Sequence, residues 1–334
     1  MHLKSRILAT AAALATAVLV VSCSGPTSDP TESGGAHELD KSIRVAYGGV
    51  AQLQYSASRV AWQELNDQGW SITEDFLPQA ELAIQALEQG EVDIVPTASS
   101  TAMKAIESGA DIVGLVAVSR AEWALVGREG IDSPKDLAGK KIAVHSETSL
   151  SNLVVQYTLS QNKIDDAEVL MIPGSPARSE ALAQGQIDAT SLFVADALRL
   201  QQQYGDDFGI VETYSDLPFV DQLLWVRRDF VDSHRAELEE IVSALLDTYE
   251  RFGTDLDWAA EESGALMPDE PKELVRAVVE EYKRIGVWPA DGGVASYEFF
   301  ADTIAFLKRG NVLSAEASDD PKDYIDLSIL EEVR

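Results

Sequence analysis

Short apolar runs alternate along the chain with longer segments whose apolar side chains recur three and four positions apart. The first pattern predicts strands and the second predicts helices, and Gly69 and Gly90 stand where two of the helices should end. The expected strands are residues 43–47, 71–77 and 92–95, and the expected helices between them are residues 53–68 and 80–88. Alternation of this kind predicts an α/β fold with a mostly parallel sheet.

A ten-residue pattern occurs twice. Residues 86–95 read ALEQGEVDIV, and 95 positions later residues 181–190 read ALAQGQIDAT. A strand precedes each copy at nearly the same distance, at 43–47 for the first and at 141–145 (KIAVH) for the second. We therefore expect two similar lobes, each with the order strand, helix, strand, helix, strand.

The repeat sets the expected division of the folded chain. We assign residues 41–128 and 222–334 to lobe 1 and residues 129–221 to lobe 2. A strand at about 222–226 would carry the chain back to lobe 1. The chain then crosses twice between the lobes, and the cleft between two hinged lobes is a natural place for a ligand.

The C-terminal part, residues 230–334, has mostly helical periodicity. Helices are expected at about 234–252, 271–285 and 297–308, with N-caps at Ser233 and Ser296 and ends at Gly286 and Gly310. These helices would pack on lobe 1.

One segment carries a family resemblance. Residues 133–144 read SPKDLAGKKIAV, in which Ser133 and Pro134 would start a helical turn and Gly139 would end it. This run resembles the start of the second lobe in type II periplasmic-binding proteins. With the GEVDIV and GQIDAT elements, the chain is similar over about 43–308 to the nitrate/sulfonate/taurine and thiamine-precursor binding group of ABC importers. The resemblance implies a two-lobed fold that closes on a solute and docks on a permease.

The composition fits a folded acidic protein. The 334 residues are 46% hydrophobic, which is enough for two packed units, but 56 acidic residues outnumber 26 Lys and Arg. A surface of net charge −30 should repel nucleic acid and anionic lipid headgroups. We expect a monomer whose partners are a small-molecule ligand and permease subunits.

The N-terminus has the layout of an export signal. Lys4 and Arg6 precede 15 uncharged residues, fewer than the about 20 needed to span a membrane. The run ends in Val-Val-Ser-Cys, which resembles a bacterial lipobox, so Cys23, the only cysteine, should carry a lipid. We expect residues 1–22 to be a signal peptide and 23–40 a flexible, lipid-anchored tether outside the cytoplasm. The alternative is an ordinary signal peptide with an incidental cysteine.

The candidate ligand residues follow the predicted strands, because ligands of α/β sheets bind beyond the carboxyl ends of the strands. They are Tyr47, Gly48 and Gln52; Thr97, Ser99 and Ser100; Ser146, Thr148 and Ser149; Phe193, at the end of an expected loop over 189–193; and Ser119 and Trp123 near the first crossing. Both serine-rich stretches should open helices, and a serine of the first should also serve as an N-cap.

These residues leave two ligand classes open. Hydroxyls and free N–H groups at helix starts suit a sulfonate-like or nitrate-like anion, which we favour slightly. The rings of Tyr47, Trp123 and Phe193 suit a neutral heterocycle such as a thiamine-pathway pyrimidine. Arg120 could hold an anion or pair with an acidic side chain, Trp225 could line the hinge or pack, and His145 should be structural.

The sequence gives little support to catalysis. It has no Ser/His/Asp array at sensible spacing, no His and Cys cluster and no G-x-G-x-x-G motif. Synthases that share the resembled fold use a cysteine-rich motif, which a chain with one cysteine cannot supply. We expect a binding protein without metal or cofactor, the alternatives being a ligand-sensing lipoprotein or an enzyme on the same fold.

Overall fold

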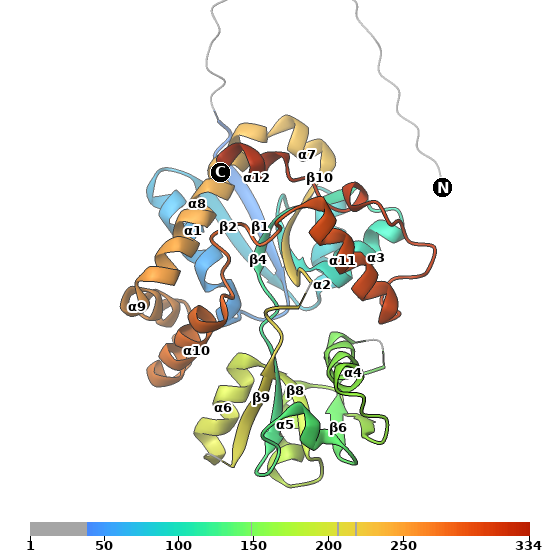
Figure 1. Ribbon diagram of the computed structural model, residues 1–334. Helices are drawn as coiled ribbons and strands as arrows, with labels where there is room; N and C mark the ends of the chain where they lie inside the picture. Colours follow the sequence, from blue (N-terminus) through green and yellow to red (C-terminus); the bar gives the residue numbers. More distant parts are fainter. Residues whose placement is uncertain (1–38, 148, 206, 218) are drawn as a thin grey trace, which may run out of the picture. The chain divides into compact units, whose positions relative to one another are not determined.

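The computed structural model describes residues 39–147, 149–205, 207–217 and 219–334. The candidate Thr148, the predicted signal peptide and Cys23 lie outside the described residues. Figure 1 shows two groups of elements, one around β1, β4 and β10 and one around β6, β8 and β9, connected by two crossings of the chain.

Lobe 1 is built on parallel and antiparallel strands. Its strands are β1 (Ser42–Gly48), β2 (Ser71–Leu77), β3 (Val95–Ala98), β4 (Ile112–Ser119) and β10 (Gln222–Arg227). β1 pairs in parallel with β2, and a parallel bridge between Val45 and Ile94 connects β1 to the start of β3. β10 lies antiparallel between β3 and β4, which gives the order β2-β1-β3-β10-β4.

Lobe 2 repeats this order. Its strands are β5 (Trp123–Arg128), β6 (Lys141–Val144), β7 (Glu168–Met171), β8 (Ala189–Phe193) and β9 (Phe208–Thr213), arranged β7-β6-β8-β5-β9. β7, β6 and β8 are parallel, and β5 is antiparallel to both of its neighbours. In each lobe, the antiparallel strand in the fourth position is therefore the one that arrives from the other lobe.

Two expectations about the strands are wrong. Residues 123–128, assigned to lobe 1 from the sequence, form β5, which pairs with β8 and β9 in the sheet of lobe 2. The first crossing therefore precedes Trp123. The expected loop 189–193 is strand β8, because these residues pair with β5 on one side and β6 on the other.

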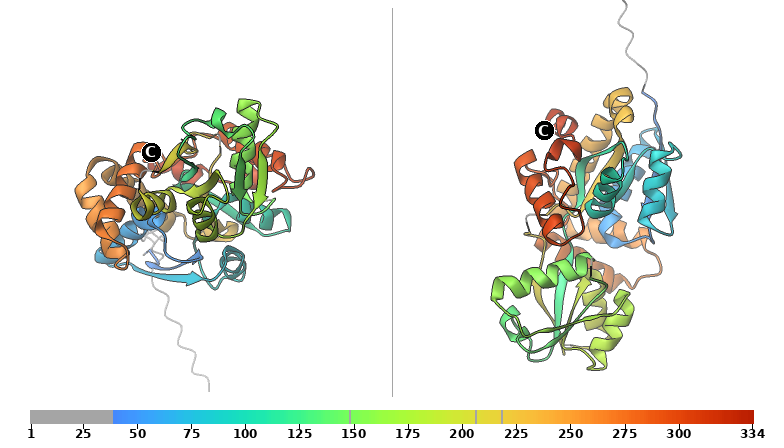
Figure 2. Two further views of the ribbon diagram at one scale, coloured as in Figure 1. Left: turned by 90° about the horizontal axis from the view of Figure 1, so that it is seen from below. Right: turned by 90° about the vertical axis from the view of Figure 1, so that its right-hand side faces the viewer.

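The helices surround the two sheets. Lobe 1 contains η1 (Leu53–Tyr55), α1 (Ser56–Asp67), α2 (Ala80–Glu88), α3 (Ser99–Glu107), α7 (Arg228–Ser233), α8 (Arg235–Thr254), α9 (Leu256–Leu266), α10 (Lys272–Ile285), α11 (Tyr297–Arg309), η3 (Pro321–Asp323) and α12 (Ser328–Val333). Lobe 2 contains η2 (Pro134–Leu137), α4 (Leu150–Asn162), α5 (Ser175–Ala183) and α6 (Val194–Tyr204). Figure 2 shows these last three helices against the sheet of lobe 2.

The helix ends show which capping predictions were correct. The Ser296 hydroxyl accepts the N–H of Phe299 at 3.1 Å, and Gly286, with φ of 67°, ends α10. The expected cap at Ser233 is wrong: this residue ends α7, and its hydroxyl donates to the Asp229 carbonyl at 2.7 Å. The short helix α7 had no signal of its own beside the strong periodicity of α8.

The sequence repeat is a structural repeat. In lobe 1, the backbone N–H of Arg44 donates to the carboxylate of Asp93 at 2.9 Å. In lobe 2, the backbone N–H of Lys141 donates to the carboxylate of Asp188 at 2.9 Å. The repeated aspartate therefore ties the first strand of each lobe to the turn before the third, which explains why it occurs in both copies.

Candidate ligand-binding cleft

A cavity of about 340 Å³, here called the cleft cavity, is lined by residues of both lobes. Lobe 1 and the first crossing contribute Val50, Ala51, Gln52, Leu53, Glu122, Met267, Glu270 and Tyr282, and lobe 2 contributes Ser175, Pro176, Phe193, Ala195, Asp196 and Arg199. Of the residues predicted from the sequence, Gln52 and Phe193 line it. A site with walls from two hinged lobes can change its size when the lobes move.

One aromatic ring of the cavity lining, that of Phe193, packs against a second aromatic ring behind it. Trp123 and Phe193 are cross-strand partners on β5 and β8, and their ring centroids lie 4.3 Å apart at an interplanar angle of 42°. Phe193 reaches the cavity because β8 ends there and α6 begins at the next residue. Phe193, supported by Trp123, gives the cavity a face suited to a planar, apolar group.

The charged side chains of the cleft cavity are mostly acidic. Arg199, the one cation of its lining, donates to Asp196 at 2.6 Å and to Glu270 at 2.8 Å. The second bond joins α6 of lobe 2 to the segment before α10 of lobe 1. Because both bonds already neutralise the guanidinium, the lining leaves an incoming anion no free positive charge.

The first crossing contains a buried carboxylate. Glu122 precedes β5, is 2% exposed and accepts the hydroxyl hydrogen of Tyr282 from α10. Burial raises the pKa of Glu122 well above its usual range, although the bond from Tyr282 acts in the opposite direction. The backbone carbonyl of Glu122 accepts the N–H of Val194 at 2.9 Å, which fixes the crossing against the start of α6.

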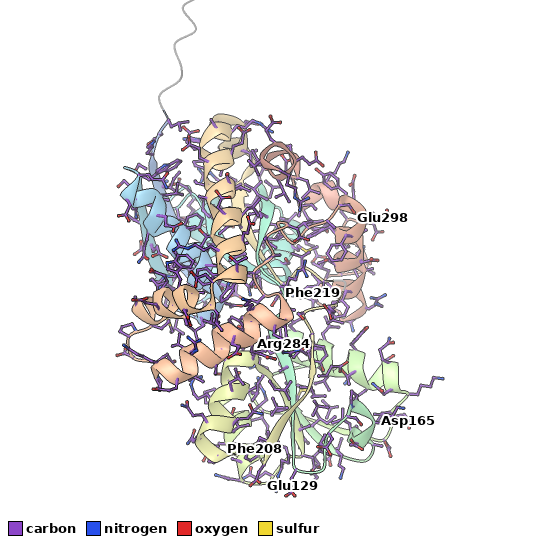
Figure 3. All side chains as sticks on the ribbon, turned by 60° about the vertical axis from the view of Figure 1, so that its left-hand side comes forward. Glu129, Asp165, Phe208, Phe219, Arg284 and Glu298 are labelled. Carbon is purple, nitrogen blue, oxygen red and sulfur yellow. The ribbon has the colours of Figure 1, made fainter. Side chains whose placement is uncertain are left out.

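The second crossing contains another buried carboxylate. Asp221 precedes β10, is 1% exposed and lies two residues after Phe219, which Figure 3 labels. Neither carboxylate oxygen has a hydrogen-bond partner among the described residues. Burial raises the pKa of Asp221 to about 7, and the nearby indole N–H of Trp123 acts in the opposite direction. That N–H does not reach hydrogen-bond geometry.

Ser99 lies beside this carboxylate. Its backbone N–H donates to the Asp221 carbonyl at 2.6 Å, while its buried hydroxyl has no partner in the described part of the chain. The expected serine cap is wrong for this helix, because Ala98 occupies the N-cap of α3. The Ser99 hydroxyl is therefore not used by the helix start.

A series of hydrogen-bonded polar side chains leads from the second crossing toward the cleft cavity. The Ser119 hydroxyl donates to the Gln54 side chain at 3.4 Å, and the Gln54 amide donates to Gln52 at 2.5 Å. The Tyr55 hydroxyl donates to Gln222 at 3.3 Å. The candidate Ser119 is thus connected to the cavity through two glutamines.

Other candidates of lobe 1 have packing roles. Tyr47 is buried, stacks on Phe76 with centroids 4.9 Å apart, and its hydroxyl accepts the indole N–H of Trp62 at 2.9 Å. At Gly48, a side chain would place its Cβ 2.2 Å from the Ala80 Cα, so the glycine allows α2 to pack closely.

The remaining candidates of β3 and α3 lie away from the cleft cavity. Thr97 is buried, and its carbonyl accepts the indole N–H of Trp225, which is itself fully buried in the core. Ser100 lines a cavity of about 490 Å³ beside α2 and α3, here called the outer cavity, whose walls belong to lobe 1 alone.

The serine-rich stretch of lobe 2 serves its helix. The Ser149 hydroxyl caps α4 by accepting the N–H of Asn152, and it donates to the Ser146 carbonyl at 2.7 Å. His145 accepts the backbone N–H of Gly174 through Nδ1 at 3.1 Å, in line with the structural role predicted for it. Neither serine lines the cleft cavity.

Arg120 pairs with Asp291 at 3.4 Å, which is the salt-bridge alternative predicted for it from the sequence.

Sequence reasoning missed several residues of the site. Glu122 and Asp221 were not singled out, although each is an acidic residue directly before an apolar strand, which is the signal that could have found them. No local signal relates Tyr282 or Glu270 to the cleft.

The described residues contain no group of three or more His, Cys, Asp or Glu side chains arranged to hold a metal ion. Across the same part of the chain, every helix is too short or too polar to cross a membrane.

Solved structures with the same fold are numerous. The sulphonate-binding protein SsuA from Escherichia coli is 18% identical, with 86% of this chain and 92% of that chain covered and a TM-score of 0.69. The nitrate-binding protein NrtA from Synechocystis PCC 6803 is 11% identical, with 90% and 89% covered and a TM-score of 0.65. A Candida albicans protein described as having the generic periplasmic binding protein fold is 16% identical, with 85% and 96% covered and a TM-score of 0.62.

These likenesses assign the two-lobed, periplasmic-binding-protein fold to the chain. The model of the NMT1/THI5-like family matches residues 67–254, which is more than half of the sequence. The chain therefore belongs to the NMT1/THI5-like family. Among curated proteins, none matches it in sequence.

Proposed function

We propose that the protein is an extracytoplasmic solute-binding protein of an ABC importer, which captures a small molecule by closing its two lobes. The observation that carries the proposal is the cleft cavity, because its walls and the bond between Arg199 and Glu270 come from both lobes. A ligand-binding component of an ABC-type import system from Staphylococcus aureus has the same fold, with a TM-score of 0.67 and 14% identity over 88% of this chain and 99% of that chain.

Of the two ligand classes that the sequence left open, the cleft cavity favours the planar heterocycle. Phe193, with Trp123 packed against it, offers a stacking face. The lining offers a sulfonate no free cation, because Arg199 is already paired with Asp196 and Glu270. A pyrimidine of the thiamine pathway is a member of the favoured class.

The membrane anchor is part of the same proposal. Cys23 would carry the lipid, and residues 23–40 would tether the lobes to the membrane beside the permease. Replacing Cys23 by alanine should move the protein from the membrane fraction to the soluble fraction of the cells. An unchanged distribution between the two fractions would contradict lipidation.

A thermal-shift screen tests solute binding. The panel contains pyrimidines, flavins, amino acids, nitrate, taurine and aliphatic sulfonates. A solute at 100 times its Kd should stabilise the fold by about 2.7 kcal/mol, which raises the unfolding midpoint by several degrees. We expect a heterocycle to be the hit.

The matched variants are Phe193→Ala, at the cavity, and Tyr204→Ala, an exposed aromatic residue at the other end of α6. The first should abolish the shift and the second should leave it intact. A shift that survives Phe193→Ala, or no shift with any of these solutes, would contradict the proposal.

A further inference from the structure

The repeat places two carboxylates in equivalent positions. The two decapeptides are 95 residues apart, and Ser99 and Val194 are separated by the same offset, so they occupy equivalent positions in the two copies of the repeat. The N–H of Ser99 donates to the Asp221 carbonyl, and the N–H of Val194 donates to the Glu122 carbonyl. Asp221 and Glu122 are each the last residue before the antiparallel strand of their lobe. The two crossings therefore each bring one acidic side chain into the hinge.

The two carboxylates differ in their partners. Glu122 is bonded to Tyr282, whereas Asp221 has no partner for either oxygen within the described residues. Around Asp221 the Ser99 hydroxyl and the Trp123 indole N–H are also buried without partners there. Ser99 is a polar residue where the equivalent Val194 is apolar.

Such a cluster needs an explanation, because an unpartnered buried carboxylate destabilises a fold. The fold does not require an unpartnered carboxylate at this corner, since the equivalent carboxylate of Glu122 accepts a hydrogen bond from Tyr282. None of the ion pairs found in the described residues includes Asp221. A partner from outside the chain would satisfy the carboxylate.

We propose that Asp221 recognises a positively charged group of the bound solute, with Ser99 beside it. Trp123 connects this group to the cleft cavity, because its ring contacts that of Phe193, which lines the cavity, at a centroid distance of 4.3 Å. A planar ring held against Phe193 would thus direct its cationic substituent past Trp123 to Asp221 when the lobes close. This inference rests on the proposed function and names the charge of its ligand.

Three probes of one shape test the inference. Benzamidine is a planar cation, benzamide is its neutral counterpart and benzoate is an anion of the same size. Titration calorimetry of the full protein at pH 8 should show benzamidine binding at least about tenfold more tightly than benzamide, as expected for a bond to a charged group. Benzoate should bind most weakly.

The variants separate charge recognition from folding. Asp221→Asn should bring benzamidine within about twofold of benzamide and leave benzamide binding unchanged, because the ring contacts remain. Asp216→Asn, an exposed residue of the same crossing, should keep the full preference. Ser99→Ala should reduce the preference without removing it. The asparagine variant loses no bond of the fold, so its thermal midpoint should not fall.

The outcomes distinguish the two proposals. Benzamidine binding no tighter than benzamide, or a preference that survives Asp221→Asn, overturns the role of Asp221 and leaves solute binding standing. If none of the aromatic probes binds, both the stacking face of the cleft and the role of Asp221 are overturned.

Discussion

Replacement of Asp221 by asparagine should stabilise the unliganded protein at alkaline pH and have little effect near pH 4. Burial raises the pKa of Asp221 from 3.8 to about 7, so the folded state holds this proton more tightly than the unfolded state. The free energy of unfolding of the wild type therefore falls as the pH rises from the unfolded pKa of Asp221, 3.8, to its folded pKa of about 7. A difference of about 3 in pKa corresponds to about 4 kcal/mol at pH 8. At pH 4 the same reasoning gives less than about 1 kcal/mol.

Thermal unfolding of the wild type and the variant at pH 8 and pH 4 measures this effect. In a chain of this size about 1 kcal/mol shifts the midpoint by roughly 2 °C, so the variant should unfold about 8 °C higher at pH 8. Glu122 titrates in both proteins, and Asp216→Asn should show no gain at either pH. A variant less stable than the wild type at pH 8, or equally displaced at both pH values, would refute the reasoning.

Three further variants test other parts of the account. Arg199→Gln removes the bond to Glu270 between the lobes, and the partial exposure of Arg199 limits the loss of stability to about 1 kcal/mol. The hit solute should nevertheless dissociate faster from this variant in stopped-flow measurements. An unchanged dissociation rate would exclude a role of Arg199 in closure. Ser149→Ala should lower the free energy of unfolding by about 1 kcal/mol in urea titrations without changing solute affinity, because the hydroxyl caps α4. Tyr47→Phe leaves the Trp62 indole N–H without its acceptor and should destabilise the fold by about 1–3 kcal/mol. A calorimetric change in solute affinity would instead place Tyr47 in the site.

The local pattern of the sequence predicted much of the fold. The strand 71–77 and the helix 80–88 have the predicted bounds, because alternation, periodicity and a terminating Gly90 are properties of neighbouring residues. Local sequence patterns could not show that β5 belongs to lobe 2. Its assignment depends on the pairing of Trp123 with Phe193, which are far apart in the chain.

The site was predictable only in part. Gln52 follows β1 and Phe193 is the last residue of β8, so both lie at the carboxyl ends of strands, which is the rule that selected them. The serines were selected as anion ligands, yet Ser149 is used as a cap and Ser100 lies at the outer cavity. The position of Asp221 directly before an apolar strand could have singled it out, but its burial without partners depends on the packing of both crossings.

The most direct test of solute binding between the lobes is a crystal structure of the protein with the hit from the thermal-shift screen. We expect the solute to lie in the cleft cavity, with its ring against Phe193 and contacts to residues of both lobes. A solute bound in the outer cavity beside Ser100, in contact with lobe 1 alone, would contradict it.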